Sequence, residues 1–141
     1  MQDRELLNYV YKGAEMGRDG LMHVIQRCDD PKFRKTLQDQ LTEYEKVFDA
    51  ADQMVRERGG KPEDTGAMAK MASYVMANAK TMTDNSPSHI AEMVIQGSTM
   101  GVTKIQKHLN DYDGHDERVR DLSHKLLKTE QANIEEMKKY L

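Results

Sequence analysis

Apolar residues recur every three or four positions along most of the chain, which is the spacing of one face of an α-helix. No segment shows the alternation of apolar and polar residues that is typical of a half-buried strand. The pattern predicts five helices, at approximately residues 3–28, 31–58, 66–83, 87–111 and 115–140. The chain is therefore expected to be all-α.

The predicted helices begin and end at characteristic residues. The stretches DDP (29–31) and NSP (85–87) each place a capping side chain directly before a proline at the first helical position. The stretch RERGGKPEDTG (56–66) reads as a loop, in which two glycines close one helix and Asp64 or Thr65 caps the next.

Four of these helices are long, and each carries one apolar stripe. The stripe of the second helix comprises Phe33, Leu37, Leu41, Tyr44, Phe48, Ala51 and Val55. The stripe of the last helix comprises Val119, Ser123, Leu127, Glu130, Ile134, Met137 and Leu141. Such stripes are typical of antiparallel helices that cross at a shallow angle.

The segment 66–83 is shorter than the other helices and lies between the second and third long ones. Its position predicts two helical hairpins joined by a long crossover that contains a short helix, within a single domain spanning residues 1–141. The second and third long helices would then run parallel to each other.

Two stretches of the chain resemble each other. GAEMGRDGL begins at Gly13 and GSTMGVTKI begins at Gly97, so both carry G-x-x-M-G, 84 residues apart. A similar shift of 86 residues lays Tyr44 over Glu130. The hairpins are therefore expected to be related by a pseudo-two-fold axis. Because glycine in a helix is unfavourable, we expect close helix contacts at these glycines, within the bundle or across a dimer: Gly13, Gly17, Gly97 and Gly101.

Charge and composition exclude several classes of function. The 141 residues include 21 Lys and Arg and 24 Asp and Glu, which gives a net charge of -3 and no basic excess for binding nucleic acid. No apolar run is long enough to span a bilayer, and the first residues do not resemble a signal peptide. Cys28 is the single cysteine, which fits a reducing cytoplasm.

The stretch SHIAEMVIQGSTMG (88–101), together with two hairpins and a long crossover, resembles the ferritin-like four-helix bundles. More narrowly, the chain is similar to small bacterial members of that superfamily without an assigned activity, including sequences from anaerobic Firmicutes. The resemblance covers nearly the whole chain. It implies a fold more than a reaction.

Ferritin-like oxidases hold two metal ions inside the bundle. Their ligands are a Glu from each of two helices and a Glu-x-x-His pair from each of the other two. Glu15 lies near the expected level, but its counterpart in the repeat is Thr99. The second helix has no histidine, and the DLSH stretch (121–124) places its histidine well away from the apolar stripe. We therefore expect a degenerate site, for which the candidate metal ligands are Glu15, Glu45 and Glu130.

Glu130 is unusual because it falls within an apolar stripe. A buried carboxylate needs a partner or must take up a proton. We expect Glu130 to be partly buried and hydrogen-bonded, with the Tyr44 hydroxyl or Arg18 as its partner. Alternatively, Glu130 is the surviving ligand of a metal or small-molecule pocket.

These observations predict a cytoplasmic bundle without intrinsic catalysis or cofactor, acting as a structural or protein-interaction module. A homodimer or a different protein would be its partner, and membrane spans and nucleic acid are not expected. The first alternative is an iron- or manganese-binding oxidoreductase, or an iron-handling protein, built around the three glutamates. A further alternative is Cu(I) binding by methionines such as Met68 and Met71, although helical spacing favours them as core residues.

Overall fold

The computed structural model describes residues 1–62 and 66–141, with the side chains of the second range given from Met68 onward. Over these residues the chain forms five α-helices and no strand, which confirms the all-α prediction. The helices are α1 (Asp3–Ile25), α2 (Pro31–Glu57), α3 (Gly66–Lys80), α4 (Pro87–Asp111) and α5 (Glu117–Lys138).

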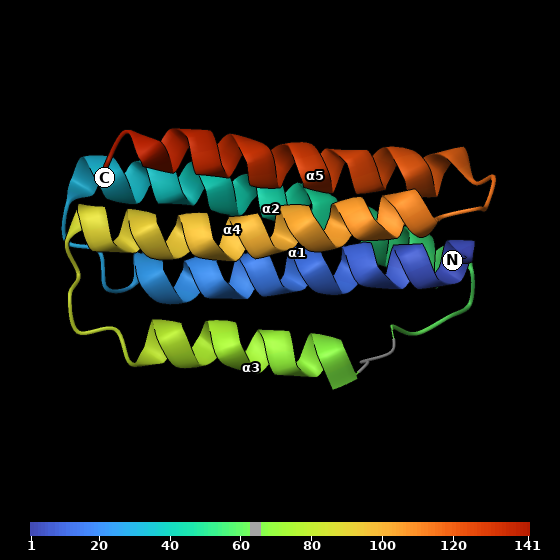
Figure 1. Cartoon of the computed structure of the whole chain (residues 1–141), viewed down its shortest axis with the longest axis horizontal. Coiled ribbons are helices and arrows are strands. Elements are labelled where there is room, and N and C mark those ends of the chain that lie inside the picture. Colours follow the sequence, from blue (N-terminus) through green and yellow to red (C-terminus); the bar gives the residue numbers. More distant parts are fainter. Residues whose placement is uncertain (63–65) are drawn as a thin grey trace.

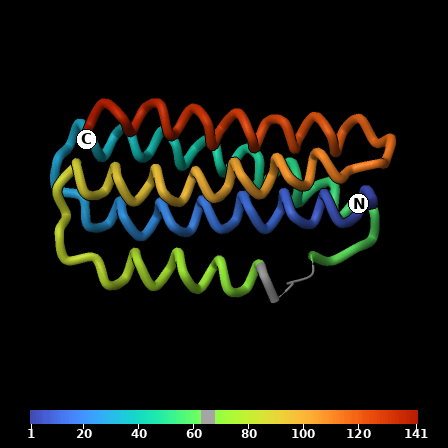
Figure 2. The backbone as a smooth tube through the Cα atoms, viewed as in Figure 1, coloured from blue at the N-terminus to red at the C-terminus, as the bar shows by residue number. Residues whose placement is uncertain are grey.

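Four of the helices form a bundle of two hairpins. α1 packs chiefly against α2, and α4 packs chiefly against α5 (Figure 1). α1 and α2 run antiparallel, as do α4 and α5, and α2 and α4 run in the same direction, as the crossover predicted. α3 lies in that crossover, outside the bundle and alongside α1 (Figure 2).

Side chains at the helix starts satisfy backbone N–H groups that have no partner within the helix. The Asp30 carboxylate accepts a hydrogen bond from the backbone N–H of Phe33 at 2.8 Å. The Ser86 hydroxyl accepts one from the backbone N–H of His89 at 3.3 Å. α2 is followed by Gly59 at a φ of +67°, a left-handed conformation that glycine adopts without a steric penalty. The sequence predicted all three signals.

Five helix boundaries differ from those expected. α3 ends at Lys80, three residues early, α2 ends at Glu57, one residue early, and α5 ends at Lys138, two residues early. α1 ends at Ile25, three residues early, because Asp30 must be extended to cap α2 and to precede a proline. α5 begins at Glu117 because Asp116 serves as its cap. The caps expected at Asp64 and Thr65 lie outside the described residues.

The core is wider than single stripes predict, since each bundle helix contacts more than one neighbour. In α2, Val47 and Met54 are buried although they lie outside the predicted stripe, whereas Leu41 and Phe48 within it are half-buried. Leu141, the predicted end of the α5 stripe, is 64% exposed because it lies beyond the end of the helix. One apolar row per helix therefore underestimated the buried surface.

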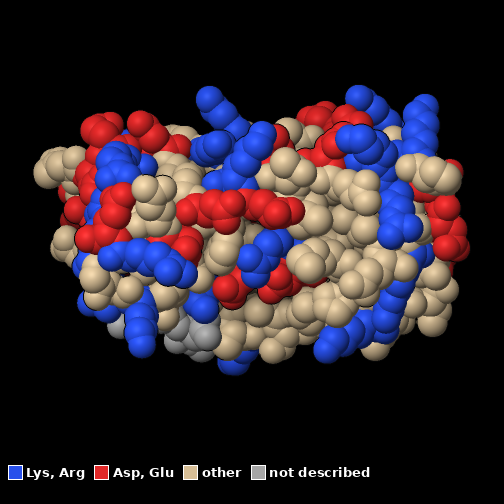
Figure 3. All heavy atoms as spheres, turned by 180° about the vertical axis from the view of Figure 1, so that it is seen from behind, with Lys and Arg blue, Asp and Glu red and all other residues tan. Residues whose placement is uncertain are grey.

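Charged side chains of both signs are interspersed over the face seen in Figure 3. This arrangement agrees with the small net charge of -3. No helix of the described chain combines the length and apolar character needed to cross a membrane.

Candidate functional site

A buried hydrogen bond joins α2 and α5 in the middle of the bundle. The Tyr44 hydroxyl donates to Glu130 Oε2 at 2.6 Å, and the two residues are 4% and 5% exposed. Arg18, the other expected partner, lies with its guanidinium over the Phe48 ring, 4.3 Å from the centroid. Its Nε donates to Asp19. The structure therefore pairs Glu130 with a neutral phenol rather than with a cation.

Two glycines make room for this pair. A Cβ atom on Gly17 of α1 would lie 2.6 Å from Tyr44 Cζ. A Cβ atom on Gly101 of α4 would lie 2.7 Å from Glu130 Oε1. Under the internal repeat Gly17 corresponds to Gly101, and Tyr44 corresponds to Glu130. In each hairpin, the first helix thus carries a glycine beside the large polar side chain that the second helix buries.

The other two glycines of the repeat behave differently. A Cβ atom on Gly13 would meet only side chains, with Leu126 Cδ2 nearest at 3.3 Å. A Cβ atom on Gly97 would meet nothing within 4 Å. Side chains therefore fill the space beside Gly13, while Gly97 borders open space. The close helix contacts expected at the four glycines, within the bundle or across a dimer, stay a prediction.

Burial sets the protonation of the pair. It raises the pKa of Glu130 to about 7, although hydrogen bonds from Tyr44 and Ser98 oppose the shift. Burial, followed by the nearby Glu130 charge, raises the pKa of Tyr44 well above its usual value, and the same two causes raise the pKa of Tyr9. Of these three groups, the Glu130 carboxyl is therefore the one that gains and loses a proton near neutral pH.

Two buried amides flank the pair, and the sequence analysis missed them. Gln40 is 5% exposed and Asn133 is 4% exposed. Both amide atoms of Gln40 and the Nδ2 of Asn133 have no hydrogen-bond partner among the described residues. Gln40 lies one turn before Tyr44 and Asn133 lies one turn after Glu130. A search for polar residues one turn from the predicted pair would have found them.

The candidate metal ligands do not come together. Glu15 is half-buried and lies 3.8 Å from Lys12 Nζ. Glu45 is exposed, because it follows Tyr44 and projects about 100° away from it around the helix. The described residues contain no group of three or more His, Cys, Asp or Glu side chains that could hold a metal ion. In the described part of the chain, Glu15, Glu45 and Glu130 therefore do not form one ligand group.

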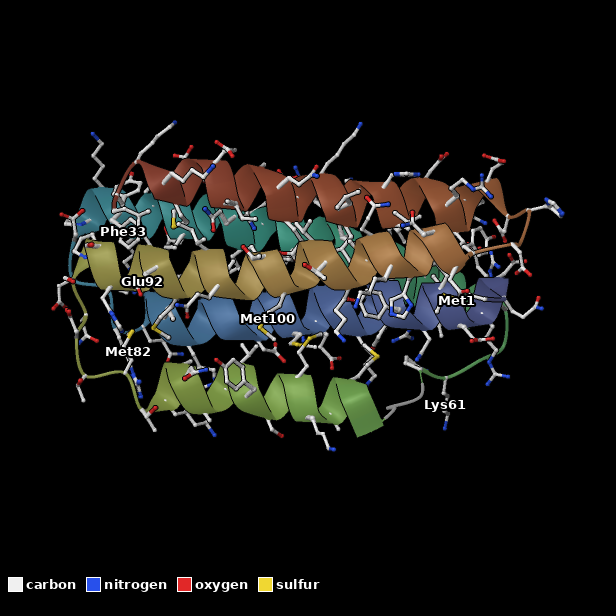
Figure 4. All side chains as sticks on the ribbon, viewed as in Figure 1. Met1, Phe33, Lys61, Met82, Glu92 and Met100 are labelled. Atoms are coloured by element: carbon white, nitrogen blue, oxygen red, sulfur yellow. The ribbon has the colours of Figure 1, made fainter. Side chains whose placement is uncertain are left out.

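A cavity of about 400 Å³ leads from Glu130 and Tyr44 to the space between α1, α3 and α4. Its walls are mostly apolar, and the methionines Met82 and Met100 lie along the side of the bundle that faces α3 (Figure 4). Gly97 lines the same cavity, which explains the open space beside it. The site thus consists of one buried carboxyl group at the end of an apolar cavity.

Comparison with known families gives a match to the domain of unknown function DUF2383 over residues 4–111. The chain belongs to this family. The matched residues span α1 to α4 and include Gly17, Tyr44 and Gly101, whereas Glu130 lies beyond them. No curated protein matches the chain.

A solved structure shares the fold of this DUF2383 chain. It is the crystal structure of a DUF305 fragment from Deinococcus radiodurans, with a TM-score of 0.75 and 12% sequence identity. The match covers 96% of this chain and 92% of the other. At this identity the similarity concerns the helical arrangement and carries no information on activity.

Proposed function

We propose that this chain is a ferritin-like bundle with a degenerate site in place of a di-metal centre, which acts as a structural or protein-interaction module rather than by catalysis. The Tyr44–Glu130 hydrogen bond is the main support for this proposal. It places a phenol and one carboxyl group in the bundle centre, where a di-metal protein needs several carboxylates and histidines.

The charge available at this position supports the same conclusion. A pair of divalent cations is stabilised by several carboxylates that neutralise and bridge it. Glu130 offers one carboxyl group, whose pKa is raised to about 7, so it carries only part of a negative charge at neutral pH. Thr99, which the repeat aligns with Glu15, is exposed and has no carboxyl group to contribute.

A symmetric homodimer is the simplest assembly for such a module. The large apolar side chains exposed on the described surface are Met22, Tyr74 and Leu141. Static light scattering across a concentration series tests this part of the proposal. A monomer at every concentration would leave a different protein as the partner.

Metal analysis tests the central part of the proposal. We expect protein expressed with added iron and manganese, and purified without chelator, to contain far less than one equivalent of either metal. Stoichiometric metal that is lost in Glu130→Ala, but retained in the control Glu135→Ala, would contradict the proposal and favour a metal-binding oxidoreductase. Glu135 is a suitable control because it is exposed and lies on the same helix as Glu130.

A further inference from the structure

We propose that the cavity between α1, α3 and α4 binds a small hydrophobic amine, whose ammonium group pairs with the Glu130 carboxylate. This inference goes beyond the proposed function, because an interaction module does not require a small-molecule site. It rests on the charge of the cavity, the unused hydrogen-bonding capacity of Glu130, and the shape of the walls.

The charge of the cavity favours a cation. Among the described residues that line it, the ionisable groups are carboxyl, phenol and imidazole, and none is Lys or Arg. The carboxyl groups belong to Glu130 and Glu92, and the imidazole to His89. The adjoining groove of about 1310 Å³ is different, since Lys70, Lys104 and Lys107 are among its lining residues. An anionic ligand would therefore favour that groove and an amine would favour the cavity.

Glu130 has acceptor capacity for an ammonium group. A carboxylate offers about four lone-pair sites. Among the described residues, the Tyr44 hydroxyl donates a hydrogen bond to it. An ammonium group has three N–H donors, and at this position it would form a charge-assisted hydrogen bond away from bulk water. Such a ligand would replace part of the solvation that the carboxylate lost on burial.

The walls suit a short apolar body behind the ammonium group. Methionines such as Met100 adapt their shape to irregular ligands. Tyr9 and Tyr74 also line the cavity, and tyrosine rings attract cations over their faces. Gly97 has no side chain to fill the space beside its part of the wall. A volume of about 400 Å³ lies within the usual range of small-ligand sites, roughly 300–1,000 Å³.

Entry to the cavity is available beside α3. This helix packs against α1, while its contact with α4 is slight. The side between α3 and α4 therefore leaves access to residues of the cavity such as Met100 and Gly97.

Three six-carbon probes test the proposal by isothermal titration calorimetry at pH 7. Hexylamine, hexan-1-ol and hexanoate each contain six carbons and differ in the polar end group, which is cationic, neutral and anionic, respectively, at this pH. We expect hexylamine to bind, and the alcohol and the acid to bind roughly tenfold more weakly or not at all. Equal binding of all three, tighter binding of hexanoate, or no binding of hexylamine would overturn the proposal.

Two variants locate the bound amine. Glu130→Gln keeps the shape and an acceptor for Tyr44, and we expect it to weaken hexylamine binding by roughly tenfold or more. Gly97→Leu places a side chain in the open cavity, and we expect it to abolish binding while the chain stays folded. Glu45→Gln and Thr99→Leu are the matched controls and should bind normally, because both residues are exposed and neither lines the cavity. Unchanged binding in both Glu130→Gln and Gly97→Leu would overturn the proposal.

Proton release gives a readout that a merely structural role would not produce. Since the pKa of Glu130 is raised to about 7, pairing with an ammonium group should expel a proton near and below that pH. Calorimetry in buffers of different ionisation enthalpy measures this release. Tyr9 of α1 and Tyr44 of α2 face the same carboxyl group, and their raised pKa values keep them protonated throughout. α4 faces it with Gly101 and Ser98, which do not titrate.

The same protein preparation distinguishes failure of the two proposals. Stoichiometric iron or manganese that depends on Glu130 would contradict the proposed function. Metal-free protein that does not bind hexylamine would contradict the amine site alone.

Discussion

Gly101 and Glu130 lie so close together that a Cβ atom on residue 101 would be 2.7 Å from Glu130 Oε1. Gly17 and Tyr44 have the same relationship in the other hairpin. A glycine within a helix costs about 1 kcal/mol. In each half of the bundle, this glycine leaves the space that one large polar side chain occupies.

We expect Gly101→Ala and Gly17→Ala to destabilise the protein by about 1–3 kcal/mol, because each added methyl group overlaps a buried side chain. Gly97→Ala is the matched control. It lies in the same helix as Gly101 with nothing within 4 Å of the new atom, so it should stabilise by roughly 0.5–1 kcal/mol. Urea unfolding measures all three. Equal effects at positions 97 and 101 would contradict this explanation.

Tyr44→Phe removes the hydroxyl that donates to Glu130 and leaves a buried carboxyl group with one donor fewer. We expect a loss of about 1–3 kcal/mol in the free energy of unfolding. A double-mutant cycle with Glu130→Gln should give a coupling energy of roughly 0.5–3 kcal/mol, because the two groups share one hydrogen bond. A coupling energy near zero would show that the bond contributes nothing to stability.

The raised pKa of Glu130 predicts a pH dependence of stability. Between its usual value of 4.5 and about 7, the folded state binds a proton that the unfolded state has lost. Stability contributed by this group is therefore full below pH 4.5, falls as the pH rises, and is lost above about 7. The difference amounts to about 3 kcal/mol.

Glu130→Gln isolates this effect from other titrating groups. We expect the stability of the variant relative to the wild type to increase from pH 5 to pH 8. The measurement is chemical unfolding of both proteins at each pH. A constant difference across the range would contradict a raised pKa in the folded state.

α3 should open more readily than the four bundle helices. It packs mainly against α1, and within its described side chains only Met68 and Ala79 are buried. We expect its backbone amides to exchange with deuterium faster than those in the middle of α2. Peptide-level hydrogen exchange measures this, and saturating hexylamine should slow exchange in α3 if the cavity is occupied. Equal protection in α2 and α3 would contradict this account.

The Asp30 cap should contribute measurably to stability. Asp30→Ala removes the acceptor of the Phe33 N–H bond and should cost about 0.5–2 kcal/mol. Asp29→Ala changes the neighbouring exposed carboxylate and should have little effect. Thermal unfolding compares the two variants. Similar losses in both would point to overall charge rather than capping.

The secondary structure could be predicted because its signals are local. Helical periodicity defined the five helices, and Asp30, Ser86 and Gly59 act within one turn of the helix ends that they define. The hairpin topology also followed from the sequence, since the position of the short crossover helix decides which long helices run parallel.

The internal repeat predicted some of the residues of the site but not their contacts. It aligned Gly17 with Gly101 and Tyr44 with Glu130, and the helical wheel indicated that the carboxyl group faces inward. Whether each glycine approaches a backbone, a side chain or open space depends on distances between helices, which no local pattern contains.

The sequence by itself therefore determined the helices, their order and the unusual position of Glu130. Only the tertiary structure decided that Tyr44, rather than Arg18, is its partner, that Glu15 and Glu45 lie elsewhere, and that an apolar cavity ends at the pair. The physical reason is that periodicity and capping act over a few residues along the chain. Partner choice and empty space arise instead from the packing of side chains that are 86 residues apart.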